Sequence, residues 1–117
     1  MNPNVTGLVI VSKKYEAMKQ FFVDLGIDII SEHEQIPQYG EKGVIVDVPS
    51  LPIILEECID MPPSGPVYLE IKDVEESRLL EMKRKYSVKQ VKHFFGVYYN
   101  VKSPDGGIVK VIPKKLT

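Results

Sequence analysis

Apolar and polar positions follow the same order twice along the chain. Residues 6–57 and residues 66–114 each read as a strand, an amphipathic helix and three further strands. The two copies also share letters at one place, the pattern Gly-Val-x-x-x-Val-x-Ser at residues 43–50 and 96–103. A repeat of this length indicates two units, neither of which buries its apolar face alone.

Two helices are predicted from apolar residues at three-and-four spacing. Ser12 is the expected N-cap of the first, and Gly26 fits the left-handed position after its last turn. The second is expected over residues 74–86, with Asp73 as its cap. Its first turn is acidic and its last turn is basic, as the helix dipole favours.

The remaining apolar segments have the pattern of strands. Strands are predicted over residues 5–11, 27–30, 43–48, 53–57, 67–71, 88–94, 96–101 and 108–112. A linker rich in proline and glycine, residues 60–66, joins the copies, and the turn at residues 103–107 joins the last two strands.

Each copy therefore reads βαβββ, which predicts an α+β fold. We expect two modules, about residues 5–58 and 66–114, within a single domain over residues 1–117. A four-stranded sheet with one helix leaves its other face uncovered, so the modules are expected to form a curved mixed sheet around a cleft. The cleft is the expected place of function.

The composition limits the classes of partner. With 15 basic and 16 acidic residues, the chain lacks the positive excess that nucleic-acid binding requires. It has no apolar run of the roughly 20 residues that span a bilayer and no signal-peptide pattern, which predicts a cytoplasmic protein without a membrane partner. The single cysteine, Cys58, is expected to act as a small apolar residue.

Three segments resemble the vicinal oxygen chelate superfamily, which includes glyoxalase I, extradiol dioxygenases, fosfomycin-resistance enzymes and bleomycin-resistance proteins. Residues 21–26 (FFVDLG) are similar to the end of that family's first helix. Residues 70–75 (EIKDVE) resemble the strand-to-helix step of its second module, and residues 103–107 (SPDGG) resemble the hairpin before its last strand. The resemblance implies paired βαβββ modules.

The resemblance also implies a divalent metal in the family's enzymes, held by His, Gln or Glu on the first, fourth, fifth and eighth strands. This chain departs from that pattern, since residues 1–12 contain none of these types and Lys110 replaces the glutamate expected after Pro-Asp-Gly. A protonated lysine repels a dication and offers no lone pair. Glu56 or Glu57 alone still matches a ligand position, so we expect no metal and no other cofactor.

Histidines and phenylalanines outside these positions are interpreted as structural or solvent-exposed. His33 lies between two glutamates and His93 lies on the sixth strand, where the family has no metal ligands. Phe94 and Phe95 are expected to make core or dimer contacts rather than to line a ligand pocket.

Strand alternation predicts which side chains face the cleft. If Val67, Leu69 and Ile71 face the helices, Tyr68 and Glu70 face the cleft, as Lys110 does on the last strand. Glu70 and Lys110 are then expected to form a buried pair beside Tyr98 or Tyr99. The expected ligand-binding residues are Glu56, Tyr68, Glu70, Tyr98, Tyr99 and Lys110. The alternative is that these charges lie at the solvent edge of a filled cleft and bind nothing specific.

The hypothesis favoured by these residues is a metal-independent protein that binds a small molecule without changing it, as in ligand sequestration or drug resistance. No catalytic residue is assigned. One alternative is a metal-dependent lyase, isomerase or dioxygenase with an atypical ligand set, and another is a protein-interaction module without a cavity. A homodimer is also expected, because the family commonly pairs modules across subunits and the chain has exposed sheet edges.

Overall fold

The computed structural model describes residues 2–33, 43–46, 51–59, 62–94 and 96–115. The elements in chain order are β1 (Leu8–Ser12), α1 (Tyr15–Asp24), β2 (Ile29–His33), β3 (Gly43–Val46), β4 (Ile53–Glu57), β5 (Tyr68–Val74), α2 (Glu76–Lys85), β6 (Val88–His93), β7 (Gly96–Lys102) and β8 (Ile108–Pro113). Neither described helix is long and apolar enough to cross a membrane.

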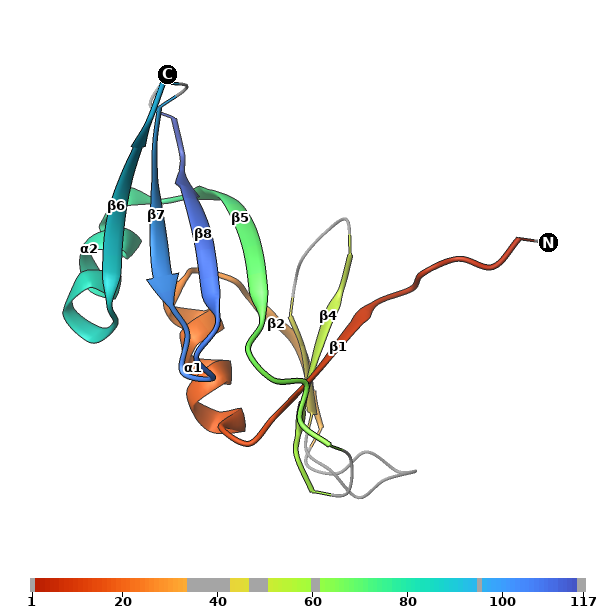
Figure 1. Cartoon of the computed structure of the whole chain (residues 1–117). Helices are drawn as coiled ribbons and strands as arrows, with labels where there is room; N and C mark the ends of the chain where they lie inside the picture. Colours follow the sequence, from red (N-terminus) through yellow and green to blue (C-terminus); the bar gives the residue numbers. More distant parts are fainter. Residues whose placement is uncertain (1, 34–42, 47–50, 60–61, 95, 116–117) are drawn as a thin grey trace.

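The strands form two four-stranded sheets of the same topology (Figure 1). The order is β1-β4-β3-β2 in the first sheet and β5-β8-β7-β6 in the second. In each sheet the first and last strands of the module pair in parallel, and the other pairs are antiparallel. The predicted α+β fold with two βαβββ modules is therefore confirmed.

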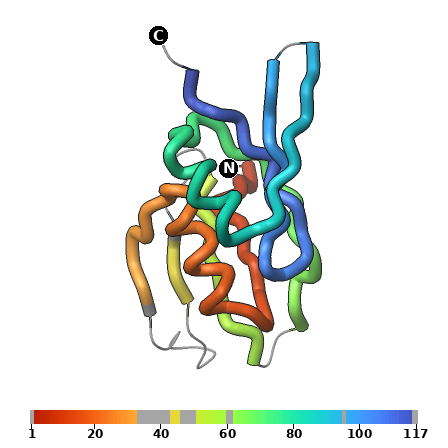
Figure 2. The backbone as a smooth tube through the Cα atoms, turned by 90° about the vertical axis from the view of Figure 1, so that its left-hand side faces the viewer, coloured from red at the N-terminus to blue at the C-terminus, as the bar shows by residue number. Residues whose placement is uncertain are grey.

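Both helices contribute to a single hydrophobic core. Figure 2 shows α2 next to α1, with the two helices on the same side of the strands. From the helices, Met18, Phe21, Phe22 and Met82 are at most 1% exposed. From the strands, the same cluster takes in Ile10, Val44, Ile53, Leu55, Val101, Val109 and Val111. The two modules therefore bury their apolar faces together, as the repeat predicts.

The end of α1 explains why β2 starts later than expected. Gly26 has φ of 89°, and its N–H donates to the carbonyl of Val23 at 2.9 Å. The N–H of Ile27 donates to the carbonyl of Phe22 at 3.1 Å. These two bonds form a Schellman motif, which needs glycine at the left-handed position. Because Ile27 completes the helix cap, β2 begins at Ile29 and not at residue 27.

The start of α2 differs from the prediction. Asp73 does not cap the helix; the N-cap residue is Glu75. Instead β5 continues past a register shift to Val74, whose side chain is 4% exposed in the core. The extension places Asp73 at φ of 61°, a left-handed conformation that aspartate tolerates better than most residues. Burial of Val74 thus takes precedence over the local capping pattern.

A polar contact joins the two helices across the module boundary. The Tyr86 hydroxyl donates to Oδ2 of Asp24 at 2.7 Å, and Lys85 Nζ lies 3.3 Å from Oδ1 of the same carboxylate. Burial alone would raise the pKa of Asp24, but hydrogen bonds from Tyr86, Gln20 and Lys85 outweigh it, so this pKa lies below its ordinary value of 3.8. Burial and the adjacent carboxylate raise the pKa of Tyr86 well above its ordinary 10.0.

The linker between the modules runs along the outer edge of β1. The N–H of Ser64 donates to the carbonyl of Val11 at 2.9 Å, and the N–H of Val11 donates to Oγ of Ser64 at 2.9 Å. Since β1 is the edge strand of the first sheet, these bonds satisfy backbone groups that point away from β4.

A backbone hydrogen bond lies at the start of the parallel strand pair in both modules, with its donor on β1 in the first module and on β8 in the second. Leu8 N–H donates to the Pro52 carbonyl at 2.9 Å in the first, and Ile108 N–H donates to the Val67 carbonyl at 3.1 Å in the second. A glycine precedes the donor in each case. A Cβ at Gly7 would lie 3.2 Å from the Pro52 oxygen, whereas a Cβ at Gly107 would overlap the Val67 oxygen and lie 2.7 Å from its carbonyl carbon. The second module is therefore closed more tightly at this point.

Candidate functional site

The candidate site lies on the face of the second sheet that points away from the helices, which we term the open face. Residues paired across neighbouring strands share a face. Val109 and Val111 are buried on the helix side, so Ile108 and Lys110 lie on the open face. Through the register, the open face also carries Tyr68, Glu70, Tyr98, Asn100, Lys102 and Lys89.

Lys110 lies at the centre of a small cluster on this face. Its Nζ is 3.4 Å from Oε1 of Glu70 and 4.4 Å from the centroid of the Tyr98 ring. The structure therefore brings Lys110 and Glu70 together, and the aromatic partner is Tyr98. The expectation of a buried pair is wrong, because the side chains of Lys110 and Glu70 are 42% and 50% exposed. An ion pair this exposed adds little to stability. Because the Lys110 side chain is partly in solvent, a ligand can reach its ammonium group.

Two shallow pockets meet at Lys110. One, of about 370 Å³, is lined by Tyr68, Leu69, Glu70, Ile108 and Lys110. The other, of about 320 Å³, is lined by His93, Gly96, Val97, Tyr98, Lys110 and Ile112. Lys110 is the residue common to both. Tyr68, whose side chain is largely in solvent, forms the outer wall of the first pocket.

Two of the expected site residues lie elsewhere. Tyr99 is on the helix side of β7, packed against the core, and Lys83 Nζ lies 5.3 Å from its ring centroid. Glu56 is in the first sheet, between Val11 of β1 and Gly43 of β3, and is 9% exposed. It lines neither of the pockets at Lys110. Tyr98 and Tyr99 are neighbours on one strand, so strand alternation puts them on opposite faces. The separation of Glu56 from Glu70 depends instead on how the two sheets are arranged.

The aromatic residues of the β6–β7 hairpin are only partly described. Phe94 is 86% exposed, which excludes a core role, and its ring stacks on His93 with centroids 4.9 Å apart. Phe95 lies outside the described residues.

The residues present do not fit the metal site that the family resemblance implies. On β1, Val9 and Val11 are on the side of the first sheet that points away from the helices, and Lys110 lies on β8 where an anionic ligand would be needed. On the two other strands that carry ligands in the family, β4 has Glu56 and Glu57 and β5 has Glu70. Within the described ranges, no group of three or more His, Cys, Asp or Glu side chains could share a metal ion. These four strands therefore offer carboxylates on β4 and β5 but not on β1 or β8, and the Glu70 carboxylate is paired with an ammonium.

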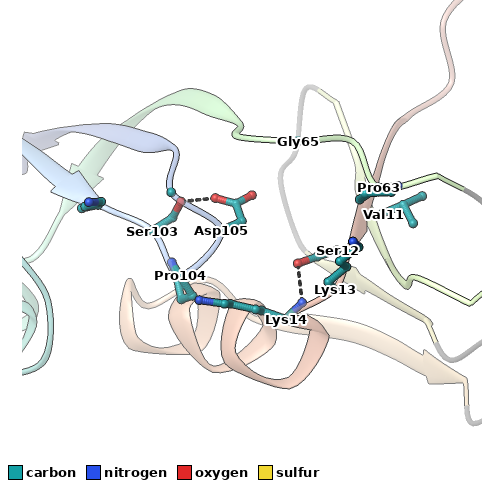
Figure 3. A pocket seen from close by; sticks show the side chains of 11 residues that line it. Val11, Ser12, Lys13, Lys14, Pro63, Gly65, Ser103, Pro104 and Asp105 are labelled. Carbon is teal, nitrogen blue, oxygen red and sulfur yellow. Dashed lines mark hydrogen bonds between the residues drawn. The ribbon is translucent and has the colours of Figure 1, made fainter.

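A larger pocket lies at the junction of the modules, away from Lys110 (Figure 3). We term it the junction pocket; it has a volume of about 480 Å³ and is lined by Val11, Ser12, Lys13, Lys14, Pro63, Gly65, Lys102, Ser103, Pro104, Asp105 and Gly106. The sequence interpretation did not find it. The signals available were the Lys-Lys pair after β1 and the Ser-Pro-Asp-Gly turn, but nothing in either segment shows that they lie together.

Comparison of the sequence with protein-family profiles gives no match, and comparison with curated proteins gives none either. Comparison of the structure does find relatives. A glyoxalase family protein from Enterococcus faecalis is similar over 92% of this chain and 95% of its own, with 16% identity and a TM-score of 0.64. The trypanothione-dependent glyoxalase I of Leishmania major gives a TM-score of 0.67 at 14% identity, over 97% of this chain and 88% of its own.

A third similar structure is the fosfomycin resistance protein FosX from Mesorhizobium loti. It covers 99% of this chain and 95% of its own length, with a TM-score of 0.65 and 6% identity. These identities are low, and the likeness lies in the arrangement of the two modules. The chain has the fold of the vicinal oxygen chelate proteins, as its sequence motifs predicted.

Proposed function

We propose that this protein binds a small organic molecule at the open face of the second sheet, without a metal and without changing the molecule chemically. The observation that carries the proposal is the position of Lys110, between Glu70 and the Tyr98 ring and on the boundary of two pockets. Fold alone does not give function, so the support comes from these side chains.

The lysine determines what kind of ligand suits the site. A protonated lysine donates up to three hydrogen bonds and accepts none. A ligand carboxylate or carbonyl can therefore take one of these bonds in place of water, while Glu70 and the Tyr98 ring keep the ammonium in position. An aromatic part of the ligand has the exposed Tyr68 ring beside it for stacking. The proposed ligand is a flat molecule that carries an acceptor group.

The proposal is tested by calorimetry and thermal-shift screening against aromatic carboxylates and drug-like compounds. A hit should lose most of its affinity in Lys110→Met, which keeps an unbranched side chain, shorter by one atom, and removes its charge. Lys92→Met is the matched control, because Lys92 is also an exposed lysine of the second sheet but lines neither pocket. Compounds that bind Lys110→Met and the native protein equally, or a broad library without a hit, would refute the proposal.

Metal independence has its own measurement. Addition of Zn, Mn or Ni, or of a chelator, is expected to leave the melting temperature unchanged, because a ligand stabilises a protein only by binding its native state. Stoichiometric metal in the purified protein, together with a rise of several degrees on reloading, would instead support the metal-dependent enzyme.

We also propose that the chain works as a cytoplasmic homodimer. Each sheet ends in edge strands that a partner subunit can cover, which supports the dimer. Phe94, at the β6–β7 hairpin, is 86% exposed. Light scattering at micromolar concentration should then give twice the 13.3 kDa mass of one chain. Phe94→Ser should weaken the dimer if the hairpin takes part in it. A mass of one chain over a wide concentration range would exclude the dimer.

A further inference from the structure

We infer that the junction pocket is a second binding site, separate from the two pockets at Lys110, and that it takes the phosphate group of a small phosphorylated molecule. Three segments far apart in sequence build it: the β1–α1 connection, the linker between modules and the β7–β8 turn. A ligand there contacts both modules at once.

The charge of the pocket favours an anion. Its lining residues include Lys13, Lys14 and Lys102 against one carboxylate, Asp105. None of the three lysines forms an ion pair with any residue in the described part of the chain. The formal charge of the lining residues is therefore +2, which matches the charge of about −1.5 to −2 that a phosphomonoester carries at neutral pH.

The pocket has a fixed wall on each side. In the turn, Oδ1 of Asp105 accepts hydrogen bonds from the Ser103 hydroxyl and from the Gly107 N–H at 2.9 Å. On the other side, Ser12 Oγ accepts from the N–H of Lys14 at 3.0 Å. Figure 3 shows the Lys14 side chain crossing from this side toward Pro104. The backbone of Lys14 and that of the turn are thus held by hydrogen bonds, which reduces the cost of ordering the site.

The size of the pocket indicates more than a bare ion. Its volume of about 480 Å³ equals that of roughly 16 water molecules in the liquid. It also lies within the usual range of pockets for small molecules. Inorganic phosphate would leave most of this space to water, so the remainder suits the organic part of a phosphomonoester.

Titration of the ¹⁵N-labelled protein with glycerol 3-phosphate tests the inference. Amide shifts are expected at residues 12–14, 64–65, 102–103 and 105–106, with weaker binding of inorganic phosphate and no shifts with glycerol. Lys14→Gln and Lys102→Gln should each weaken binding about tenfold, the usual effect of losing a hydrogen bond from a charged group. Lys92→Gln is the control, and the spectra themselves show that each variant is folded.

Several results would overturn the inference. They are the absence of shifts up to about 10 mM glycerol 3-phosphate, shifts spread evenly over all the surface lysines, or the same affinity in the double variant Lys14→Gln, Lys102→Gln as in the native protein. The variant Lys110→Met distinguishes a failure of this inference from a failure of the proposed function. It should abolish binding at the open face and leave the phosphate titration unchanged.

Discussion

The two modules have the same strand order but differ in the chemistry of their open faces. The first sheet presents Val9, Ile45 and Ile54 on the face away from the helices, with Glu56 further along β4. The second presents lysines, a glutamate and tyrosines on the face away from the helices. On the helix side both sheets bury branched aliphatic residues in one core. Topology and core are therefore shared, while the faces that do not take part in the core are free to differ.

The largest expected difference between the modules concerns the glycines that start the parallel strand pairs. Gly107→Ala should destabilise the protein by more than about 3 kcal/mol, because the new Cβ would overlap the backbone of Val67. Gly7→Ala should cost less than about 1 kcal/mol, since its Cβ would meet the Pro52 oxygen at 3.2 Å and needs only a small adjustment. Urea denaturation of both variants checks this. Equal losses of stability would mean that the two modules tolerate an added Cβ at these glycines equally well.

A second, intermediate effect tests whether the modules unfold together. Tyr86→Phe should cost about 1–2 kcal/mol at neutral pH, because it removes a hydrogen bond to the Asp24 carboxylate. If the shared core couples the modules, chemical denaturation of the variant should still show one transition, seen alike by near- and far-ultraviolet circular dichroism. Two separate transitions would show that the helix contact holds independent modules together.

The same pair predicts a pH dependence with a definite sign. The pKa of Asp24 is lowered in the folded protein, so its contribution is complete above its unfolded value near 3.8 and is lost as the pH falls through the folded pKa. The pKa of Tyr86 is raised, so its contribution is complete below 10.0 and declines as the pH rises above that value. In Tyr86→Phe the alkaline decline should be smaller. A native protein whose stability is level across both ranges would contradict the role of this pair.

The smallest effects should come from the open faces themselves. Lys110→Met should change stability by less than about 0.5 kcal/mol, because the ion pair that it removes is half exposed. Ile54→Lys, at the partly buried centre of the first sheet's open face, should cost about 1 kcal/mol, since it places a charge among apolar neighbours. Thermal denaturation of the two variants compares the faces directly. A larger loss of stability in Lys110→Met than in Ile54→Lys would show that the cluster around Lys110 has a structural role.

Local patterns predicted much of the fold. The bounds of β4, the cap at Gly26 and the repeat of strand order follow from periodicity and turn chemistry, which act over a few residues. The pairing of Glu70 with Lys110 also follows, because alternation on two strands places both on one face. Strand alternation does not predict how exposed this pair is, because the exposure depends on which part of the molecule lies opposite the sheet.

Other features depend on contacts between distant segments. The extension of β5 to Val74 is set by the core and by pairing with the end of β8, and these override the local signal for a cap at Asp73. The junction pocket needs Lys14, the linker and Lys102 in one place. Hydrophobic periodicity reports which face of an element is buried, but it does not report which elements meet at their ends.

The linker beside β1 has a consequence for behaviour in concentrated solution. An edge strand with valines at positions 9 and 11 is a template on which another chain can add a strand and start an aggregate. Ser64 occupies the backbone donor and acceptor of Val11, so the linker shields part of that edge against intermolecular β-pairing. By covering this edge, the segment that connects the modules also reduces fibril growth from the first sheet.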